Sequence, residues 1–249
     1  MTTPRNERPS MSRTLGDGWT GISRALFYSS GFFGGLVALL TLVSGCANKP
    51  SVFDPAVTGP FHQIGNYYLV DQKLPDDIRR VAMMPLTAVQ TDYASVAAVE
   101  SLQPVLYGEL SKLRAFDITI IPRSKLQDLT GQSSWSPDDR LPNNFLYQIT
   151  NTTACDAILF SRVTHYHAFP PMAIGWKMLM VNTKGDVLWS VDEVFDAGEA
   201  RVVNSAHRYA MQNEMTAPEI EPHTGLVNSP RFFSQYAASE VVKTLLNKR

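Results

Sequence analysis

Side chains suited to covalent or metal chemistry are few in this sequence, which has two cysteines and five histidines. Cys46 follows Ser44 and Gly45, whose small side chains give a peptidase access to the backbone. Its thiol could then act as a nucleophile toward a lipid donor. Cys155 lies in an apolar stretch and is expected to be a small buried hydrophobe. If Cys46 carries lipid, Cys155 has no cysteine left for an internal disulfide.

The sequence His165-Tyr166-His167 is the pattern that comes closest to a metal site. On a strand both imidazoles point to the same side, about 7 Å apart. Zinc needs a third and a fourth ligand, and no spacing supports one; the other histidines are His62, His207 and His223. We therefore predict no metal, no cofactor other than a covalent lipid, and no catalytic residue. A metal-dependent envelope enzyme using His165 and His167 remains the weaker alternative.

The remaining polar patterns are typical of structure rather than catalysis. Asp138 and Asp139 follow Ser136-Pro137, which indicates a capping turn. Glu193 interrupts an apolar strand face and is expected to pair with Arg162 or to mark the end of burial. The sequence has neither a phosphate-binding glycine loop after its first strand nor a G-x-S-x-G motif.

Residues 1–45 have the pattern of a secretory signal peptide. Four arginines precede a short apolar core that ends in small residues. This core is shorter than the roughly 20 residues that a membrane-spanning helix needs, although an uncleaved anchor is the alternative. Either Met1 or Met11 could be the start of the chain. Cleavage before Cys46 would remove four arginines and two acidic residues, changing the formal net charge from −1 to −3. A weakly negative net charge gives no sign of the basic surface that nucleic-acid binding requires.

The stretch Val43-Ser44-Gly45-Cys46 resembles the bacterial lipobox. The resemblance implies that Cys46 becomes the acylated first residue of the mature chain, carrying palmitate-type fatty acyl groups. Ala47 follows it, and a residue other than Asp there implies the outer membrane rather than the inner one, with the domain facing the periplasm.

Residues 46–78 are predicted to be a tether and lead-in, because prolines interrupt them repeatedly; the run 67–70 could add an edge strand. Residues 79–249 are predicted to form one α/β domain. Strands are expected at 79–86, 116–121 and 157–163, followed by a hairpin at 172–182 and 187–196 with its turn at 184–186. Helices are expected at 94–114, near 124–131, from Pro142 in the first turn of the third helix, at 197–216 and from Pro230. Alternating βα units predict a three-layer sandwich with a mixed sheet, in which a parallel core is extended by an antiparallel hairpin.

Several helix boundaries can be predicted from capping residues. Ser124 and Gln127 have the spacing of a capping box, and Gly131 would end that helix. Ser229 and Pro230 would begin the last helix, whose apolar stripe is Phe233, Tyr236, Ala237, Val241 and Leu245. Pro104 requires the helix at 94–114 to kink or to start there. The helix at 197–216 should turn inward Ala200, Val203, Ala206 and Tyr209.

The stretches VAMMPL, FDITIIPRSKLQDL and CDAILFSRVTHY, followed by the hairpin with TKGDVLW, resemble the Rossmann-like TolB amino-terminal type of fold. That fold is shared by curli-secretion lipoproteins and other periplasmic lipoproteins, and the resemblance covers about residues 79–198. It implies a non-enzymatic role in envelope assembly, often as an oligomer. Charged residues on the outer side of the hairpin argue against a membrane pore.

Together these features predict a lipid-anchored binding or scaffold protein, with a homo-oligomeric secretion component of the curli type as the alternative. Its partners would be envelope proteins. Tyr166, Phe169 and Met172 gather in one loop after the third strand and are the candidate contacts, unless that loop packs under the hairpin.

Overall fold

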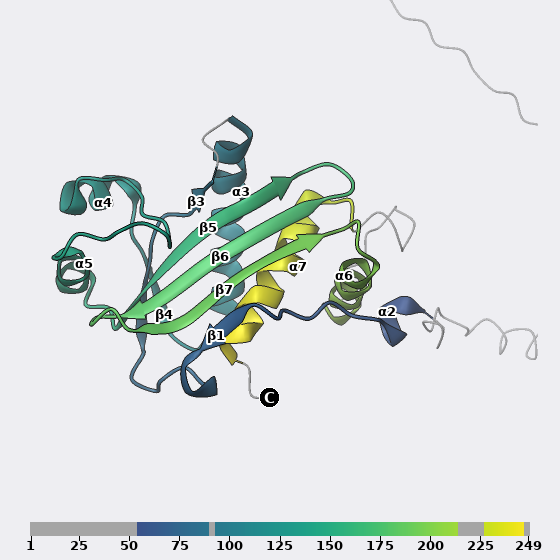
Figure 1. Ribbon diagram of the computed structural model, residues 1–249, viewed down its shortest axis with the longest axis horizontal. Coiled ribbons are helices and arrows are strands. Elements are labelled where there is room, and N and C mark those ends of the chain that lie inside the picture. The colour runs from purple at the N-terminus through teal and green to yellow at the C-terminus, as the bar shows by residue number, and fades with distance from the viewer. Residues whose placement is uncertain (1–53, 90–92, 214–226, 247–249) are drawn as a thin grey trace, which may run out of the picture. The chain divides into compact units, whose positions relative to one another are not determined.

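The computed structural model describes residues 54–89, 93–213 and 227–246 of the chain (Figure 1). In this part it has seven strands: β1 (Tyr67–Leu69), β2 (Arg80–Met83), β3 (Thr87–Ala88), β4 (Asp117–Ile120), β5 (Ala157–His167), β6 (Ala173–Asn182) and β7 (Val187–Asp196). Its helices are α2 (Pro55–Thr58), α3 (Tyr93–Lys112), α4 (Arg123–Thr130), α5 (Phe145–Thr153), α6 (Ala200–Gln212) and α7 (Pro230–Lys243). None of the helices described is long and apolar enough to cross a bilayer.

The strands form one mixed sheet in the order β1-β7-β6-β5-β2-β4, with β3 paired to β5 outside this path. Strands β4, β2 and β5 run parallel, whereas β5, β6, β7 and β1 pair antiparallel. The parallel core arises because helices connect β2, β4 and β5, and the long hairpin β6–β7 extends it. The predicted α/β class, the parallel core and the antiparallel hairpin are thus confirmed, including the turn at Gly185, whose φ is 92°.

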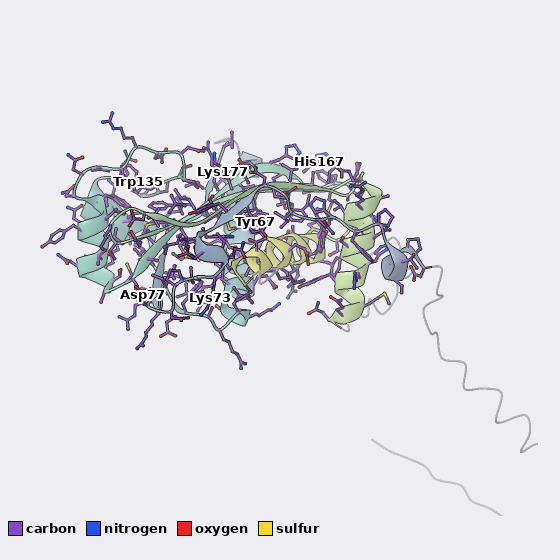
Figure 2. All side chains as sticks on the ribbon, turned by 60° about the horizontal axis from the view of Figure 1, so that its bottom comes forward. Tyr67, Lys73, Asp77, Trp135, His167 and Lys177 are labelled. Atoms are coloured by element: carbon purple, nitrogen blue, oxygen red, sulfur yellow. The ribbon has the colours of Figure 1, made fainter. Side chains whose placement is uncertain are left out.

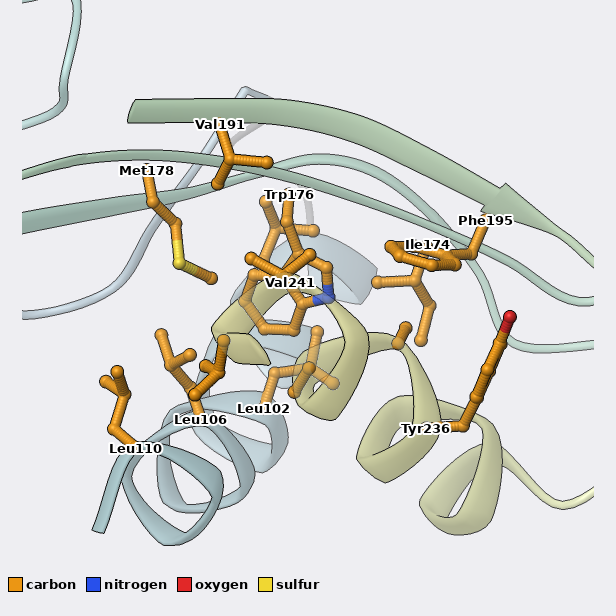
Figure 3. Close-up of a cluster of buried hydrophobic side chains, with 14 of the residues drawn as sticks. Leu102, Leu106, Leu110, Ile174, Trp176, Met178, Val191, Phe195, Tyr236 and Val241 are labelled. Carbon is orange, nitrogen blue, oxygen red and sulfur yellow. The ribbon is translucent and has the colours of Figure 1, made fainter. Parts of the chain in front are cut away.

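Helices α3, α6 and α7 cover one side of the sheet, which we call the inner face. In Figure 1, α3 and α7 pass behind the strands. Figure 3 shows leucines of α3 and Tyr236 and Val241 of α7 meeting side chains of β6 and β7. Each predicted residue of the α7 stripe is buried, and Ser229 caps that helix as expected. Trp189 adds a buried hydrogen bond, donating from Nε1 to Thr244 Oγ1 at 2.9 Å.

Helices α4 and α5 cover part of the opposite side, the outer face. Their cluster includes Trp135, Phe145, Ile158, Phe160 and the buried thiol of Cys155. The edge-on contact of Trp135 with Phe145, at 5.2 Å between ring centroids, packs the loop at 131–144 into this cluster. Helices on both faces confirm the three-layer arrangement, although the outer layer reaches only the strands near α4 and α5 (Figure 1).

Two of the predicted helix starts are wrong. α4 is capped by Pro122, so Ser124 lies inside the helix and forms no capping box; Gln127 instead donates to the carbonyl of Gly131, which ends the helix as predicted. α5 begins at Phe145 with Asn144 as its N-cap, so Pro142 lies before the helix. Pro122 has extended backbone at the cap of α4, and the Pro142 carbonyl accepts from the Phe145 amide in a turn that precedes α5.

Two further helices differ from the predicted pattern. α3 starts at Tyr93 and continues through Pro104, so it does not begin at the proline. α6 buries Val202, Ser205, Ala206, Tyr209 and Ala210, whereas Ala200 is exposed and Val203 only half-buried. The inward side of α6 is therefore turned toward Val202 and Ser205, because polar Ser205 and Asn204 bond to the lead-in segment that covers them.

Residues 54–78 are packed against the domain. α2 lies against α6, and the His62 amide donates to Ser205 Oγ at 2.9 Å. The Arg208 guanidinium lies 4.4 Å from the centre of the Phe61 ring. β1 pairs with Trp189 to Val191 of β7, which confirms the expected edge strand. The lead-in is thus part of the fold from α2 onward.

Candidate interaction surface

The β5–β6 loop presents the aromatic side chain of Phe169 to solvent and buries Met172 at its end. Phe169 is 74% exposed, whereas Met172 is only 1% exposed. Met172 therefore cannot serve as the predicted surface contact, because its side chain enters the inner core and its carbonyl accepts from the Ala197 amide at 2.7 Å. Tyr166 is half-buried against the same core. Of the three candidate contacts, the structure leaves Phe169 accessible.

Phe169 is held in place by contacts within its own loop. His167 Nδ1 donates to the Pro171 carbonyl at 2.9 Å, which closes the loop across its base. The Phe169 ring meets the His167 ring nearly edge-on, with centroids 6.3 Å apart. A braced aromatic loses little conformational entropy on binding, which suits it to anchor a partner.

His165 and His167 are both exposed near the carboxyl end of β5. A bulge between Val163 and His165 shifts the register there, and His167 uses Nδ1 for the loop. Among the described residues, no group of three or more His, Cys, Asp or Glu side chains is arranged to hold a metal ion. His167 therefore has a structural task in the β5–β6 loop, and the His165 side chain is exposed.

Beyond α4 and α5, the outer face carries a row of paired charges. Arg162 faces Lys177, and Lys177 faces Asp192, across β5, β6 and β7. Asp138 reaches this row from the loop above it, at 2.7 Å from Arg162 and 2.6 Å from Lys177. The hydrogen bond from Lys177 is the main cause that lowers the pKa of the Asp138 carboxyl. Figure 2 shows Trp135, Lys177 and His167 along the same side of the sheet.

This network corrects the predicted pairing of Glu193 with Arg162. Arg162 pairs with Asp138, and Glu193 lies 3.4 Å from His62 of the lead-in on the inner side. Asp139 accepts from the Ser136 amide at 2.7 Å, which confirms the capping turn. The ion pairs of Asp138 were missed, because they join residues far apart in the sequence and no local spacing signals them.

A shallow depression of about 280 Å³ lies between this row and β1. Its lining combines the exposed ring of Tyr68 with Asn66, which precedes β1, and with polar and charged groups of β6 and β7: Lys177, Ser190 and Asp192. We call these residues, together with exposed Val194 of β7, the outer surface. Such a mixture can stack, donate and accept hydrogen bonds and pair with charges of either sign, which fits recognition of another molecule.

The predicted modification site lies elsewhere. Residues 1–45, the lipobox and Cys46 are outside the described residues, as are His223 and both candidate start residues. Lipidation of Cys46 therefore stays a prediction from the sequence.

Comparison with known proteins yields similar structures but no similar sequences. No family model matches the chain, and no curated protein matches it. A PelC dodecamer variant from Paraburkholderia phytofirmans aligns at a TM-score of 0.35 and 10% identity, covering 55% of this chain and 88% of PelC. The lipoprotein GNA1162 from Neisseria meningitidis aligns at 0.39 and 14%, covering 55% and 97%. Escherichia coli LpoB aligns at 0.33 and 11%, covering 79% and 92%.

These TM-scores and identities are low, so the likeness carries no residue roles to this chain. The resemblance to the TolB and curli-lipoprotein type is not confirmed by them and stays a prediction.

Proposed function

We propose that this protein is a lipid-anchored, non-enzymatic binding or scaffold protein of the bacterial outer membrane, with its α/β domain in the periplasm. The observation that carries the proposal is the sequence Val43-Ser44-Gly45-Cys46 after a short apolar run. Acylation of Cys46 would fix the chain to the membrane, since each buried CH₂ group contributes about 0.8 kcal/mol.

The packing of the lead-in limits how far the domain could lie from such an anchor. The structure describes the chain from Asp54, where the side chain caps α2. Between Cys46 and Asp54 a fully extended chain spans at most about 28 Å, at roughly 3.5 Å per residue. The domain would therefore work close to the membrane and meet partners there.

Two accessible places on the surface support the binding role. Phe169 offers a braced apolar anchor, and the outer surface offers an aromatic ring among charges of both signs. Envelope proteins are the partners we propose. Measuring the mass of the particle in detergent distinguishes a monomer from a homo-oligomer.

The anchor is tested by mass spectrometry of the purified protein. We expect a chain that begins at Cys46 and carries fatty acyl groups, whereas a Cys46→Ser variant should be unmodified and leave the outer-membrane fraction. An intact chain that retains residues 1–45 without fatty acid would overturn the proposal.

The partner is tested by photo-crosslinking in cells. A crosslinkable amino acid replaces Phe169 in one strain and Tyr147, which is 70% exposed on α5, in the control strain. We expect a discrete crosslinked product from position 169 that is absent from position 147. Equal products at both positions would mean that Phe169 is not the contact.

A further inference from the structure

Strand β4 leaves one edge of the sheet open. The Asp117 amide donates to the Arg79 carbonyl at 2.7 Å, and the Ile121 amide donates to the Met83 carbonyl at 3.1 Å. Successive residues of a strand turn their backbone groups to opposite sides, so Ile118 and Ile120 direct theirs away from β2. β4 is the last strand of the sheet order, and no described residue bonds to these groups.

This edge lacks two of the residues that commonly block strand pairing, proline and lysine. Its four residues, DITI, contain neither proline nor lysine, and Ile120 is 42% exposed. Native sheets commonly block exposed edges with such residues or with a covering element. An open edge that still carries β-branched side chains is suited to accept another strand.

A groove of about 560 Å³ runs beside this edge, against α3. Arg79, Arg114, Tyr107, Ser111 and Asp117 are among its lining residues. The guanidinium groups of Arg79 and Arg114 make no hydrogen bond or ion pair to any residue in the described ranges. Arg162 and Arg123 differ from them, because each donates to a partner within the fold.

We propose that the β4 edge binds an extended acidic peptide, which adds to the sheet as a further strand. Backbone groups of Ile118 and Ile120 would bond to the peptide backbone, and Arg79 and Arg114 would bind its carboxylates. The groove is lined by two arginines and one carboxylate, Asp117, so its net charge is positive. A second copy of this edge would also be positive and would repel the first. A negatively charged strand is therefore the complementary partner. The proposal does not depend on lipidation of Cys46.

The test uses fluorescence polarisation of the purified full chain with a labelled peptide of four Val-Glu repeats. We expect saturable binding that a Val-Lys peptide of equal length does not show. A Val-Glu peptide N-methylated at two valines and two glutamates should also fail, because both of its edges lose donors. Equal binding of the Val-Lys peptide would overturn the charge argument, and equal binding of the N-methylated peptide would overturn strand addition.

Variants of the protein locate the site. Arg79→Gln and Arg114→Gln should each weaken binding about tenfold, the effect expected for one charge-assisted contact. Lys125→Gln on α4 is the control, since it removes an exposed cation elsewhere and should bind like the wild type.

Ile120→Pro removes an outward backbone donor that β2 does not use, and proline is tolerated at such edge positions. We expect an unchanged melting temperature and binding weakened tenfold or more. Wild-type affinity in a folded Ile120→Pro variant, or in both arginine variants, would exclude the β4 edge. If Ile120→Pro does not fold, the N-methylated peptide decides the question of strand addition.

Discussion

The inner and outer faces of the same strands have opposite characters. On the inner face, β5, β6 and β7 meet α3, α6 and α7 in a continuous apolar core (Figure 3). On the outer face, α4 and α5 cover only the start of β5 and its neighbours, and paired charges occupy the rest. The inner face provides stability, whereas the outer face is available for recognition.

β5 shows where this change occurs. Its first five residues, from Ala157 to Ser161, are all buried, as expected for a strand between two helical layers. From Arg162 onward buried and accessible residues alternate, because the outer layer has ended. A sheet can therefore combine a protected half and an accessible half without changing strands.

The largest expected difference comes from removing one phenyl ring from the inner core and one from the exposed β5–β6 loop. Phe233 is 0% exposed in the inner core, so Phe233→Ala should lower the free energy of unfolding by about 3–5 kcal/mol. Phe169→Ala should change it by less than about 0.5 kcal/mol. Urea unfolding followed by circular dichroism measures both. Similar losses would contradict the assignment of Phe169 to the surface.

A medium effect is expected at Gly175 on the outer face. A Cβ placed there would lie 2.3 Å from Thr164 Oγ1, so Gly175→Ala should cost about 1–3 kcal/mol. Thr164→Ala removes that oxygen and should restore part of the loss in the double variant. The backbone of His165 stays 3.0 Å away, so the rescue should be incomplete. Strictly additive free energies would show that Thr164 is not the obstacle.

The smallest effect is expected for Asp138, which is 42% exposed at its side chain. Asp138→Asn should cost at most about 1 kcal/mol near neutral pH. Its pKa is lowered in the folded state, so the stabilisation is complete above the unfolded value and lost as the pH falls through the folded one. The difference from wild type should stay constant down to about pH 5 and shrink below 3.8.

Asp128→Asn is the matched control for this series, since Asp128 is an exposed carboxylate of α4 without an ion pair to any described residue. Its unfolding free energy near neutral pH should differ from the wild type by less than about 0.5 kcal/mol. A wild-type pH profile for Asp138→Asn would mean that the ion pairs do not form in solution.

Much of the fold could be predicted from periodicity and capping. The buried run after Arg80, the α7 stripe and the β6–β7 hairpin each depend on neighbours close in sequence, and the structure has them as predicted. On α6, Ala206 and Tyr209 are buried as predicted, but Ala200 is exposed and the burial of Asn204 and Ser205 was missed, because these polar residues bond to Pro60 and His62 of the lead-in. Such long-range contacts leave no period in the sequence.

The surface was harder to predict than the fold. The aromatic content of the β5–β6 loop pointed to Phe169, but alternation alone could not tell that Met172 turns inward while Phe169 turns outward. The charge network of Asp138, Arg162 and Lys177 and the open edge of β4 depend on which strands are neighbours. Sequence patterns specify strands more readily than their order.

The route of the lead-in also determines how a pulling force would enter the domain. Tension applied at the amino-terminal side would first load α2 and the bonds of Pro60 and His62 to α6. Only after these gave way would β1 be peeled from β7, one residue pair at a time. The central strands and their core would yield later than these contacts, so the domain could keep its shape while its outermost contacts give way.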